Sequence, residues 1–186
     1  HTRLQGDWSS DVCSSDLEWA TQEYIPYVWG GISFVNKCSN KFRKETSGLR
    51  KYYVVDKCNQ RVKTGFDCSN VILRAAQIAG MPFYFKNTYT IGQNLKSVSP
   101  DEAIPECAII IWPGHVIVLT SASRGTIVEA GDYSYGWGRL HKVSISNFFK
   151  GLKTTKDLQS VYKKKEPLFR LDPNGKVVQK ISNFKI

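Results

Sequence analysis

A cysteine at the start of a predicted helix is the first candidate for chemistry in this 186-residue chain. Cys68 follows Gly65-Phe66-Asp67 and precedes apolar residues at helical spacing. A thiol attacks a carbonyl as the thiolate, and a helix N-terminus with a neighbouring imidazole lowers a cysteine pKa from about 8.5 to roughly 3.5–7.5. Cys68 is therefore the candidate nucleophile, and Asp67 is a candidate N-cap for its helix.

The base that serves this thiol must be brought to it by the tertiary structure. Apart from His1, the chain contains His115 and His141. His115 opens an apolar stretch directly after Pro113-Gly114, whereas His141 lies among basic residues, where a surface role is more natural. We therefore expect His115 to act as the base.

A third polar group is needed to fix the tautomer of the imidazole and steady its positive charge, and Glu129 is the candidate. If residues 121–123 form a three-residue hairpin loop, paired residue numbers sum to 244 and His115 lies directly opposite Glu129. A five-residue loop gives a sum of 246 and a diagonal pair on the same face, whereas an even-numbered loop separates the two. The alternative is an exposed strand carboxylate without a catalytic role.

These residues need a helix and a sheet to position them, and the sequence predicts both. The apolar spacing predicts a helix over residues 69–79, and Gly80 and Pro82 supply its stop signal. Three apolar segments, residues 108–112, 115–120 and 126–130, are typical of an antiparallel meander. Asp172-Pro173-Asn174-Gly175 predicts a turn between strands at residues 168–171 and 176–181.

Three motifs occur in a recognisable order: Pro26-Tyr27-Val28-Trp29-Gly30-Gly31, Gly65-Phe66-Asp67-Cys68-Ser69 and Gly114-His115-Val116. Over residues 24–150 the chain resembles the NlpC family of papain-like cysteine peptidases. The resemblance implies an α+β papain-like fold, in which the helix carrying the nucleophile packs on an antiparallel β-sheet, here with a C-terminal β-hairpin extension.

The same resemblance assigns roles to single residues. It makes Cys68 the nucleophile and His115 the general base, and Glu129 stands where the family places its third polar residue, often a histidine. Tyr27 matches a tyrosine that lines the site, and its hydroxyl could donate to an oxyanion. Asp67 and Ser69 match positions that contact the free amino end of a peptide substrate, and the alternative for both is helix capping. The chain departs from the family in its long segment 32–64 and in lacking the Gly-Asp pair before the histidine strand.

The first seventeen residues resemble a translated sequencing adapter, which the run Asp7–Leu17 matches, so we interpret residues 1–17 as an artefact. Removing these 17 residues from 186 leaves 169, with 25 basic and 13 acidic residues and a net charge of +12. This size suits a catalytic domain over residues 18–150 and a basic extension over residues 151–186 that packs on it. A basic surface favours polyanionic surroundings but does not choose among nucleic acid, membrane and cell wall.

The remaining cysteines have no spacing typical of a zinc site, and we expect no metal or other cofactor. Cys38 and Cys58 form a disulfide in an exported protein or are two free thiols. No apolar run reaches the roughly twenty residues of a membrane span. Lys163–Lys165 are interpreted as a solvated face, with tethering to wall or membrane as the alternative, and no nucleic-acid-binding module is recognisable.

The resemblance implies a cysteine endopeptidase of the periplasm or cell exterior, and we expect the protein to be a monomer. It would hydrolyse peptidoglycan stem peptides, at the bond between D-glutamate and diaminopimelate as in many family members. One alternative is a papain-like amidase or acyltransferase acting on a substrate outside the wall. Another is a wall-binding module whose catalytic site has decayed.

Overall fold

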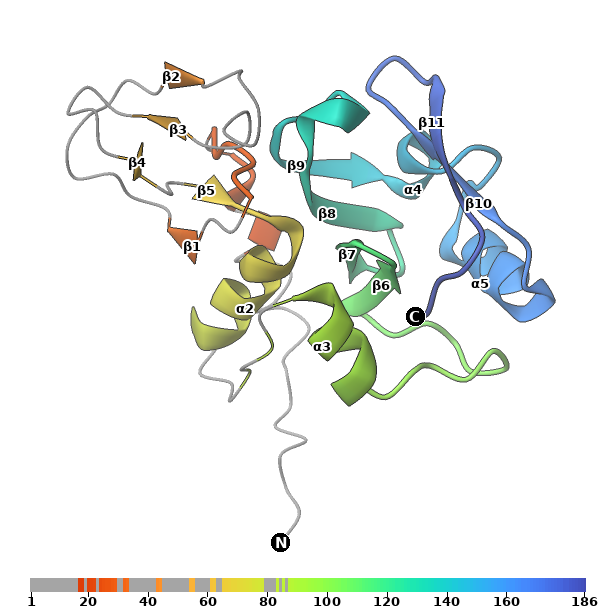
Figure 1. Ribbon diagram of the computed structural model, residues 1–186. Helices are drawn as coiled ribbons and strands as arrows, with labels where there is room; N and C mark the ends of the chain where they lie inside the picture. Colours follow the sequence, from red (N-terminus) through yellow and green to blue (C-terminus); the bar gives the residue numbers. More distant parts are fainter. Residues whose placement is uncertain are drawn as a thin grey trace, which may run out of the picture.

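The computed structural model (Figure 1) describes residues 17–18, 20–22, 24–29, 65–78, 83, 85 and 87–186, and four short strands between residues 32 and 62. In chain order its elements are β1 (Ile32–Ser33), β2 (Arg43–Lys44), β3 (Val54–Val55), β4 (Arg61–Val62), β5 (Gly65–Phe66), α2 (Cys68–Ile78), α3 (Thr88–Asn94), β6 (Ala108–Trp112), β7 (His115–Ser121), β8 (Thr126–Gly131), the 3-10 helix η2 (Tyr133–Tyr135), β9 (Arg139–Ser144), α4 (Ile145–Phe148), α5 (Thr155–Lys164), β10 (Leu168–Leu171) and β11 (Val177–Ile181).

The central sheet has four antiparallel strands in the order β6-β7-β8-β9. Strands β6, β7 and β8 correspond to the three apolar segments, and β9 joins them by pairing along β8. Helix α2 begins at Cys68 and packs on this sheet (Figure 1). The predicted α+β class, with the Cys68 helix on an antiparallel sheet and a C-terminal hairpin, is therefore confirmed.

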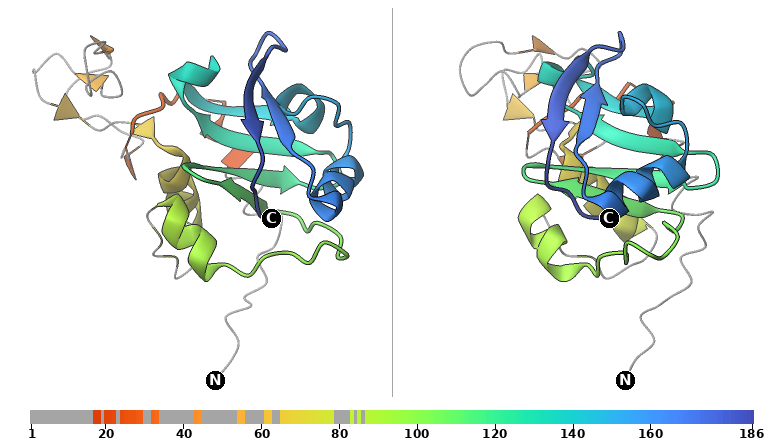
Figure 2. Two further views of the ribbon diagram at one scale, coloured as in Figure 1. Left: turned by 45° about the vertical axis from the view of Figure 1, so that its right-hand side comes forward. Right: turned by 90° about the vertical axis from the view of Figure 1, so that its right-hand side faces the viewer.

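Side-chain alternation along the sheet separates two cores. Val116 and Val118 of β7 pack in a core that contains the apolar residues of α2. Ile117 and Leu119, on the opposite face, pack in a second core with residues of α4, α5, β10 and β11. Figures 1 and 2 show the sheet between α2 and this C-terminal group of elements. Burying each such aliphatic side chain stabilises the fold by about 1.5–3 kcal/mol.

Two β-bridges join the C-terminal segment to the rest of the fold, one to the end of α4 and one to β6. Strands β10 and β11 are antiparallel, and Phe149 forms a β-bridge with Arg170. Further along, Ile111 of β6 forms a bridge with Lys185. Residues on both sides of the predicted boundary after residue 150 share the second core, and the boundary itself stays a prediction.

Two helices that the apolar pattern did not predict have clear capping. Asn87 caps α3, since its Oδ1 accepts the Thr90 N–H at 2.8 Å. Thr154 and Asp157 form a capping box at the start of α5. The Thr154-x-x-Asp157 spacing was a sequence signal for α5.

Several predictions concern residues that the structure does not describe. Residues 1–16, Cys38 and Cys58 lie outside the described part, so the adapter interpretation and the disulfide stay predictions. Leu17, the last residue assigned to the adapter, is described and is buried in the first core.

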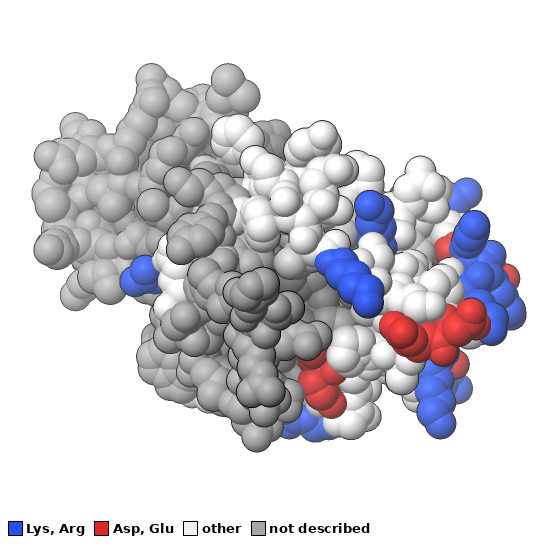
Figure 3. Space-filling view, turned by 90° about the horizontal axis from the view of Figure 1, so that it is seen from below, with Lys and Arg blue, Asp and Glu red and all other residues white. Residues whose placement is uncertain are grey.

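The basic run at the end of α5 is exposed to solvent. Lys163, Lys164 and Lys165 are all exposed, and the Lys163 Nζ lies 2.6 Å from Asp101 Oδ1. Seen from below (Figure 3), basic side chains on this face lie beside acidic ones. Among the described helices, none has the length and apolar character needed to cross a membrane.

Candidate active site

Asp67 organises the start of the helix that carries Cys68. Its Oδ1 accepts the backbone N–H groups of Ser69 at 3.1 Å and Asn70 at 2.7 Å, and its Oδ2 accepts the Asn70 side-chain amide at 2.9 Å. The Ser69 hydroxyl donates to the same carboxylate at 3.0 Å. Asp67 therefore caps the helix, as predicted. Its contact with a substrate, and that of Ser69, stay predictions. Cys68 carries a free thiol and is 5% exposed.

Gly65 lets the aromatic segment approach the nucleophile helix. Its φ is +128°, and a Cβ at this position would lie 2.3 Å from the carbonyl oxygen of Pro26. This close approach accompanies a parallel bridge between Tyr27 and Phe66. The structure thus brings Tyr27 into the buried cluster that contains Cys68, with 6% of Tyr27 exposed.

His115 stands at the first position of β7, after the Gly114 turn. It forms a side-chain hydrogen bond with Cys68, and its Nε2 contacts the Glu129 Oε1. Because Glu129 occupies Nε2, Nδ1 is the ring atom left for the thiol. The Trp112 ring, with its centroid 5.0 Å from that of His115, packs beside it. The structure therefore brings Cys68, His115 and Glu129 together in one line of contacts.

The charge state of His115 follows from its contacts with Cys68 and Glu129. Burial disfavours the imidazolium and acts to lower the pKa of His115, but the Glu129 carboxylate and hydrogen bonds with Cys68 and Glu129 outweigh it. Together they raise the pKa of His115 from 6.5 to about 9. At neutral pH His115 is an imidazolium, which can balance a thiolate and donate a proton.

The hairpin between β7 and β8 places Glu129 on the same face of the sheet as His115, although its loop has an even number of residues. Val118 pairs with Val128 and Leu119 with Ile127, so residue numbers sum to 246 and Glu129 is diagonal to His115. Near the turn Ser121 pairs with Thr126, leaving four loop residues, 122–125. The expectation that an even loop separates the two side chains was wrong, because a register shift between Leu119 and Ser121 offsets it.

Glu129 is buried, with 1% of its surface exposed, so the alternative of an exposed carboxylate was wrong. Besides His115, its Oε1 lies 2.5 Å from the Arg170 Nη2, and its Oε2 lies 3.3 Å from the His141 Nε2. Burial acts to raise the pKa of Glu129, but Arg170 and then His115 outweigh it and lower the pKa below 4.5. The carboxylate is ionised at neutral pH.

His141 does not have the surface position expected from its basic neighbours. It is 3% exposed, because β9 pairs it with Glu129 on the adjacent strand. The indole of Trp137 stacks on its ring at 3.7 Å between centroids, and its Nδ1 lies 3.2 Å from the Arg139 carbonyl. Burial outweighs the attraction of Glu129 and lowers the pKa of His141 below 6.5. His141 is thus a neutral neighbour of Glu129.

The sequence reasoning assigned no role to Arg170, a fully buried residue of β10. Gly131 was also missed. A Cβ at this position would lie 2.9 Å from His141 Cε1 and 3.0 Å from Glu129 Oε2. Gly131 therefore leaves room for the carboxylate and the second histidine.

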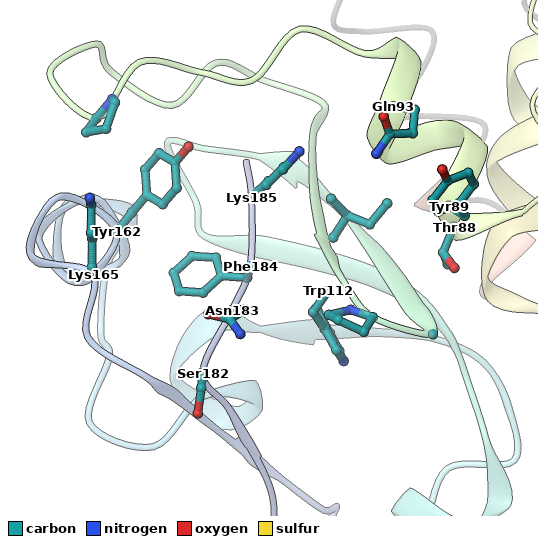
Figure 4. Close-up of a pocket in the computed structure, with 15 residues that line it drawn as sticks. Thr88, Tyr89, Gln93, Trp112, Tyr162, Lys165, Ser182, Asn183, Phe184 and Lys185 are labelled. Atoms are coloured by element: carbon teal, nitrogen blue, oxygen red, sulfur yellow. The ribbon is translucent and has the colours of Figure 1, made fainter.

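A cavity of about 670 Å³ lies between α3, the end of β6 and the residues after β11 (Figure 4), and Cys68, His115 and Glu129 are not among its lining residues. Its wall includes Trp112, the ring that packs beside His115, together with Tyr89, Tyr162 and the basic residues Lys165 and Lys185. The cavity begins at the turn before His115 and has the size of a small-ligand site.

No group of three His, Cys, Asp or Glu side chains within the described residues is arranged to hold a metal ion. The contacts of Cys68 and His115 can support proton transfer and nucleophilic attack by a thiolate beside an imidazolium.

Comparisons with known proteins give one similarity to report. No family model matches the chain, and no curated protein matches it. Among solved structures, the peptidoglycan hydrolase RipB from Mycobacterium tuberculosis is similar, with 18% sequence identity and a TM-score of 0.48. The similarity covers 77% of this chain and 62% of the RipB chain, so this chain spans less than two thirds of the length of RipB.

Proposed function

We propose that this chain is a cysteine hydrolase that cleaves amide bonds in peptidoglycan stem peptides. The observation that carries the proposal is the buried line Cys68–His115–Glu129, in which an imidazole contacts a thiol on one side and an ionised carboxylate on the other. Nucleophile, base and orienting group in this order are the arrangement that thiol-dependent acyl transfer needs.

In the first half of the reaction the Cys68 thiolate attacks the carbonyl carbon of the scissile amide. The carbonyl oxygen becomes an oxyanion, to which the Tyr27 hydroxyl could donate a hydrogen bond. His115, protonated at neutral pH, gives its proton to the amide nitrogen, the C–N bond breaks and the amine leaves. The product is a thioester between the substrate acyl group and Cys68.

In the second half a water molecule replaces the amine. His115, now neutral, takes one proton from the water as the oxygen attacks the thioester carbonyl. The C–S bond breaks, which releases the carboxylic acid and restores the thiolate beside the imidazolium. Glu129 keeps the imidazole oriented in both halves and stays ionised, because Arg170 and His115 stabilise its charge.

The substrate class comes from the resemblance of the three motifs to the NlpC family. That resemblance favours a stem peptide, the bond between D-glutamate and diaminopimelate, and action in the cell envelope. For Asp67 and Ser69 it favours contact with the free amino end of the peptide, which Asp67 could make while its carboxylate caps the helix. The cavity beside Trp112 offers space for further parts of a wall fragment.

Incubation of residues 18–186 with defined muropeptides tests the proposal, with products identified by mass spectrometry. We expect cleavage by the native chain and none by Cys68→Ala, whereas Cys107→Ala serves as a matched control at a cysteine outside the line. No cleavage of any wall peptide by a folded native chain would overturn the proposed substrate.

The alternatives give different outcomes in the same set of experiments. An acyl-enzyme trapped on Cys68 with a substrate that is not a wall peptide would identify an amidase or acyltransferase instead. A Cys68 that does not react with iodoacetamide near neutral pH would favour a decayed wall-binding module.

A further inference from the structure

Arg170 is a charged side chain from the C-terminal hairpin that lies in the centre of the protein. Among the described residues it is the largest fully buried side chain, with 0% exposed. Burying an unpaired charge is so costly that a buried guanidinium needs a carboxylate nearby. The Arg170 Nη2 lies 2.5 Å from Glu129 Oε1, the oxygen that also contacts His115.

The rest of the Arg170 environment fixes its position. Its guanidinium carbon lies 3.9 Å from the ring centroid of Tyr135 and 5.1 Å from that of Phe148. Aromatic faces attract a guanidinium and restrict its movement. The bridge between Phe149 and Arg170 ties β10 to the end of α4. Arg170 is thus a preorganised partner of Glu129.

We propose that Arg170 is a positioning residue of the active site, which holds Glu129 ionised and oriented toward His115. The C-terminal hairpin is then part of the catalytic centre and not merely a structural appendage. This inference rests on the proposed function, because it assigns Arg170 a role in the chemistry of the Cys68–His115–Glu129 line.

Four groups on four elements act on or respond to the Glu129 charge: His115 on β7, His141 on β9, Arg170 on β10 and Tyr135 on η2. Burial acts to raise the pKa of Glu129, and Arg170 is the largest of the influences that lower it. Without Arg170 the carboxyl group keeps its proton to higher pH. A neutral Glu129 no longer stabilises the imidazolium of His115, so the thiolate of Cys68 loses its counter-charge as well.

The test measures how fast iodoacetamide alkylates Cys68 between pH 4 and 9, peptide by peptide, by mass spectrometry. Arg170→Met removes the charge at similar volume, and Arg124→Met is the matched control, since the Arg124 side chain is 65% exposed on the surface. We expect Arg170→Met to shift the acid limb of the Cys68 profile upward by about one pH unit, a roughly tenfold slower reaction on that limb. Cys107 in the same samples is the internal standard.

A double-mutant cycle separates positioning from a general effect on folding. If Arg170 acts through Glu129, Arg170→Met changes the profile of the native chain but adds nothing in a Glu129→Gln background. Where Arg170→Met alone does not fold, Arg170→Lys replaces it: this variant keeps a positive charge beside Glu129, so we expect a Cys68 profile close to that of the native chain. An unchanged Cys68 profile in a folded Arg170→Met variant would overturn the inference, and so would a further loss in the double variant.

The alkylation assay uses no wall peptide, so its outcome is independent of the substrate proposed above. A native chain that cleaves no muropeptide but shows the expected shift refutes the proposed substrate and leaves the role of Arg170 standing. If the Arg170→Met variant cleaves muropeptides as fast as the native chain does, the role of Arg170 is refuted and the proposed substrate stands.

Discussion

The two histidines on either side of Glu129 differ although they contact the same carboxylate. His115, at the start of β7, reaches Oε1, and its pKa is raised to about 9. His141, in β9, lies 3.3 Å from Oε2, yet its pKa is lowered. Both rings are buried, so burial does not explain the difference.

The partners of each ring explain it. His115 hydrogen-bonds to Glu129 and to the thiol of Cys68, and both contacts favour the imidazolium. Burial lowers the pKa of His141, and the nearby charges of Arg170 and Arg139 oppose a second positive charge as well. One carboxylate can therefore hold one imidazolium, and the fold assigns that charge to the histidine beside the cysteine.

Replacing each histidine in turn by glutamine should give the largest difference in activity between two variants. His115→Gln removes the proton donor and acceptor, so kcat/KM on a cleaved peptide should fall by a factor on the order of 10³ or more. His141→Gln keeps a neutral polar group beside Glu129, and we expect a loss of no more than about tenfold, on the scale of a partner outside the reacting groups. Equal losses of kcat/KM in the two variants would show that the two histidines do not differ in their role.

Glu129→Gln should remove the feature that makes the two histidines different. Without the carboxylate, burial acts on His115 with little opposition, so the pKa of His115 falls well below 9, and kcat falls by roughly 10–100-fold. NMR titration of labelled histidines measures the first effect and steady-state kinetics the second. A His115 signal that still titrates near pH 9 would show that Cys68, and not Glu129, sets its charge.

The stability of the fold should depend on pH with opposite signs on the two sides of pH 6.5. The raised pKa of His115 stabilises the folded state below about 6.5, and this contribution, at most roughly 3 kcal/mol, is lost as pH rises through about 9. The lowered pKa of His141 makes the folded state lose stability as pH falls below 6.5.

Urea denaturation across this range measures both slopes. We expect maximal unfolding free energy near pH 6.5. The His115→Gln variant, tested alongside, should lose the alkaline slope and keep the acid one. A native chain equally stable at pH 6.5 and pH 9 would contradict the assigned charge of His115.

Gly131→Ala should act on the His141 side of the carboxylate. The added Cβ would lie 2.9 Å from His141 Cε1 and 3.0 Å from Trp137 Cβ, so the stacked pair must shift. Overpacking of this kind costs about 1–3 kcal/mol of unfolding free energy, measurable by thermal denaturation. Gly151→Ala is the control for a glycine with open space, although its φ of +80° adds backbone strain. A Gly131→Ala variant as stable as the native chain would mean that the pair is loosely packed.

The smallest effect should come from the cavity on the His115 side. Lys185→Gln removes a charge from the wall that includes Trp112, so we expect a KM higher by about threefold on an acidic wall peptide with kcat unchanged. Lys180→Gln, on the exposed side of β11, is the control. A fall in kcat in place of a rise in KM would place Lys185 in the chemistry.

The sequence was sufficient for the part of the site that local patterns encode. The glycine and aspartate before Cys68 mark a helix start, and the apolar runs around His115 mark strands, so the two halves of the thiol–imidazole pair were predictable. Glu129 was predictable only up to the register, because a bulge changes which loop lengths keep it on the face of His115.

The rest of the site depends on contacts that no local pattern carries. His141 is flanked by charged residues, and only its pairing with β8 places it inside. Arg170 lies far along the chain from Glu129, on a strand whose other residues are apolar, and arginine is usually exposed. The burial of both residues follows from strand pairing in three dimensions and not from their neighbours in the sequence.

The position of Arg170 in the chain also affects when the protein becomes competent during synthesis. The nucleophile helix and the histidine strand leave the ribosome first, whereas the guanidinium that secures the charge of Glu129 arrives with β10, about a hundred residues after Cys68. A nascent chain released before that point would carry a thiol without its full electrostatic support.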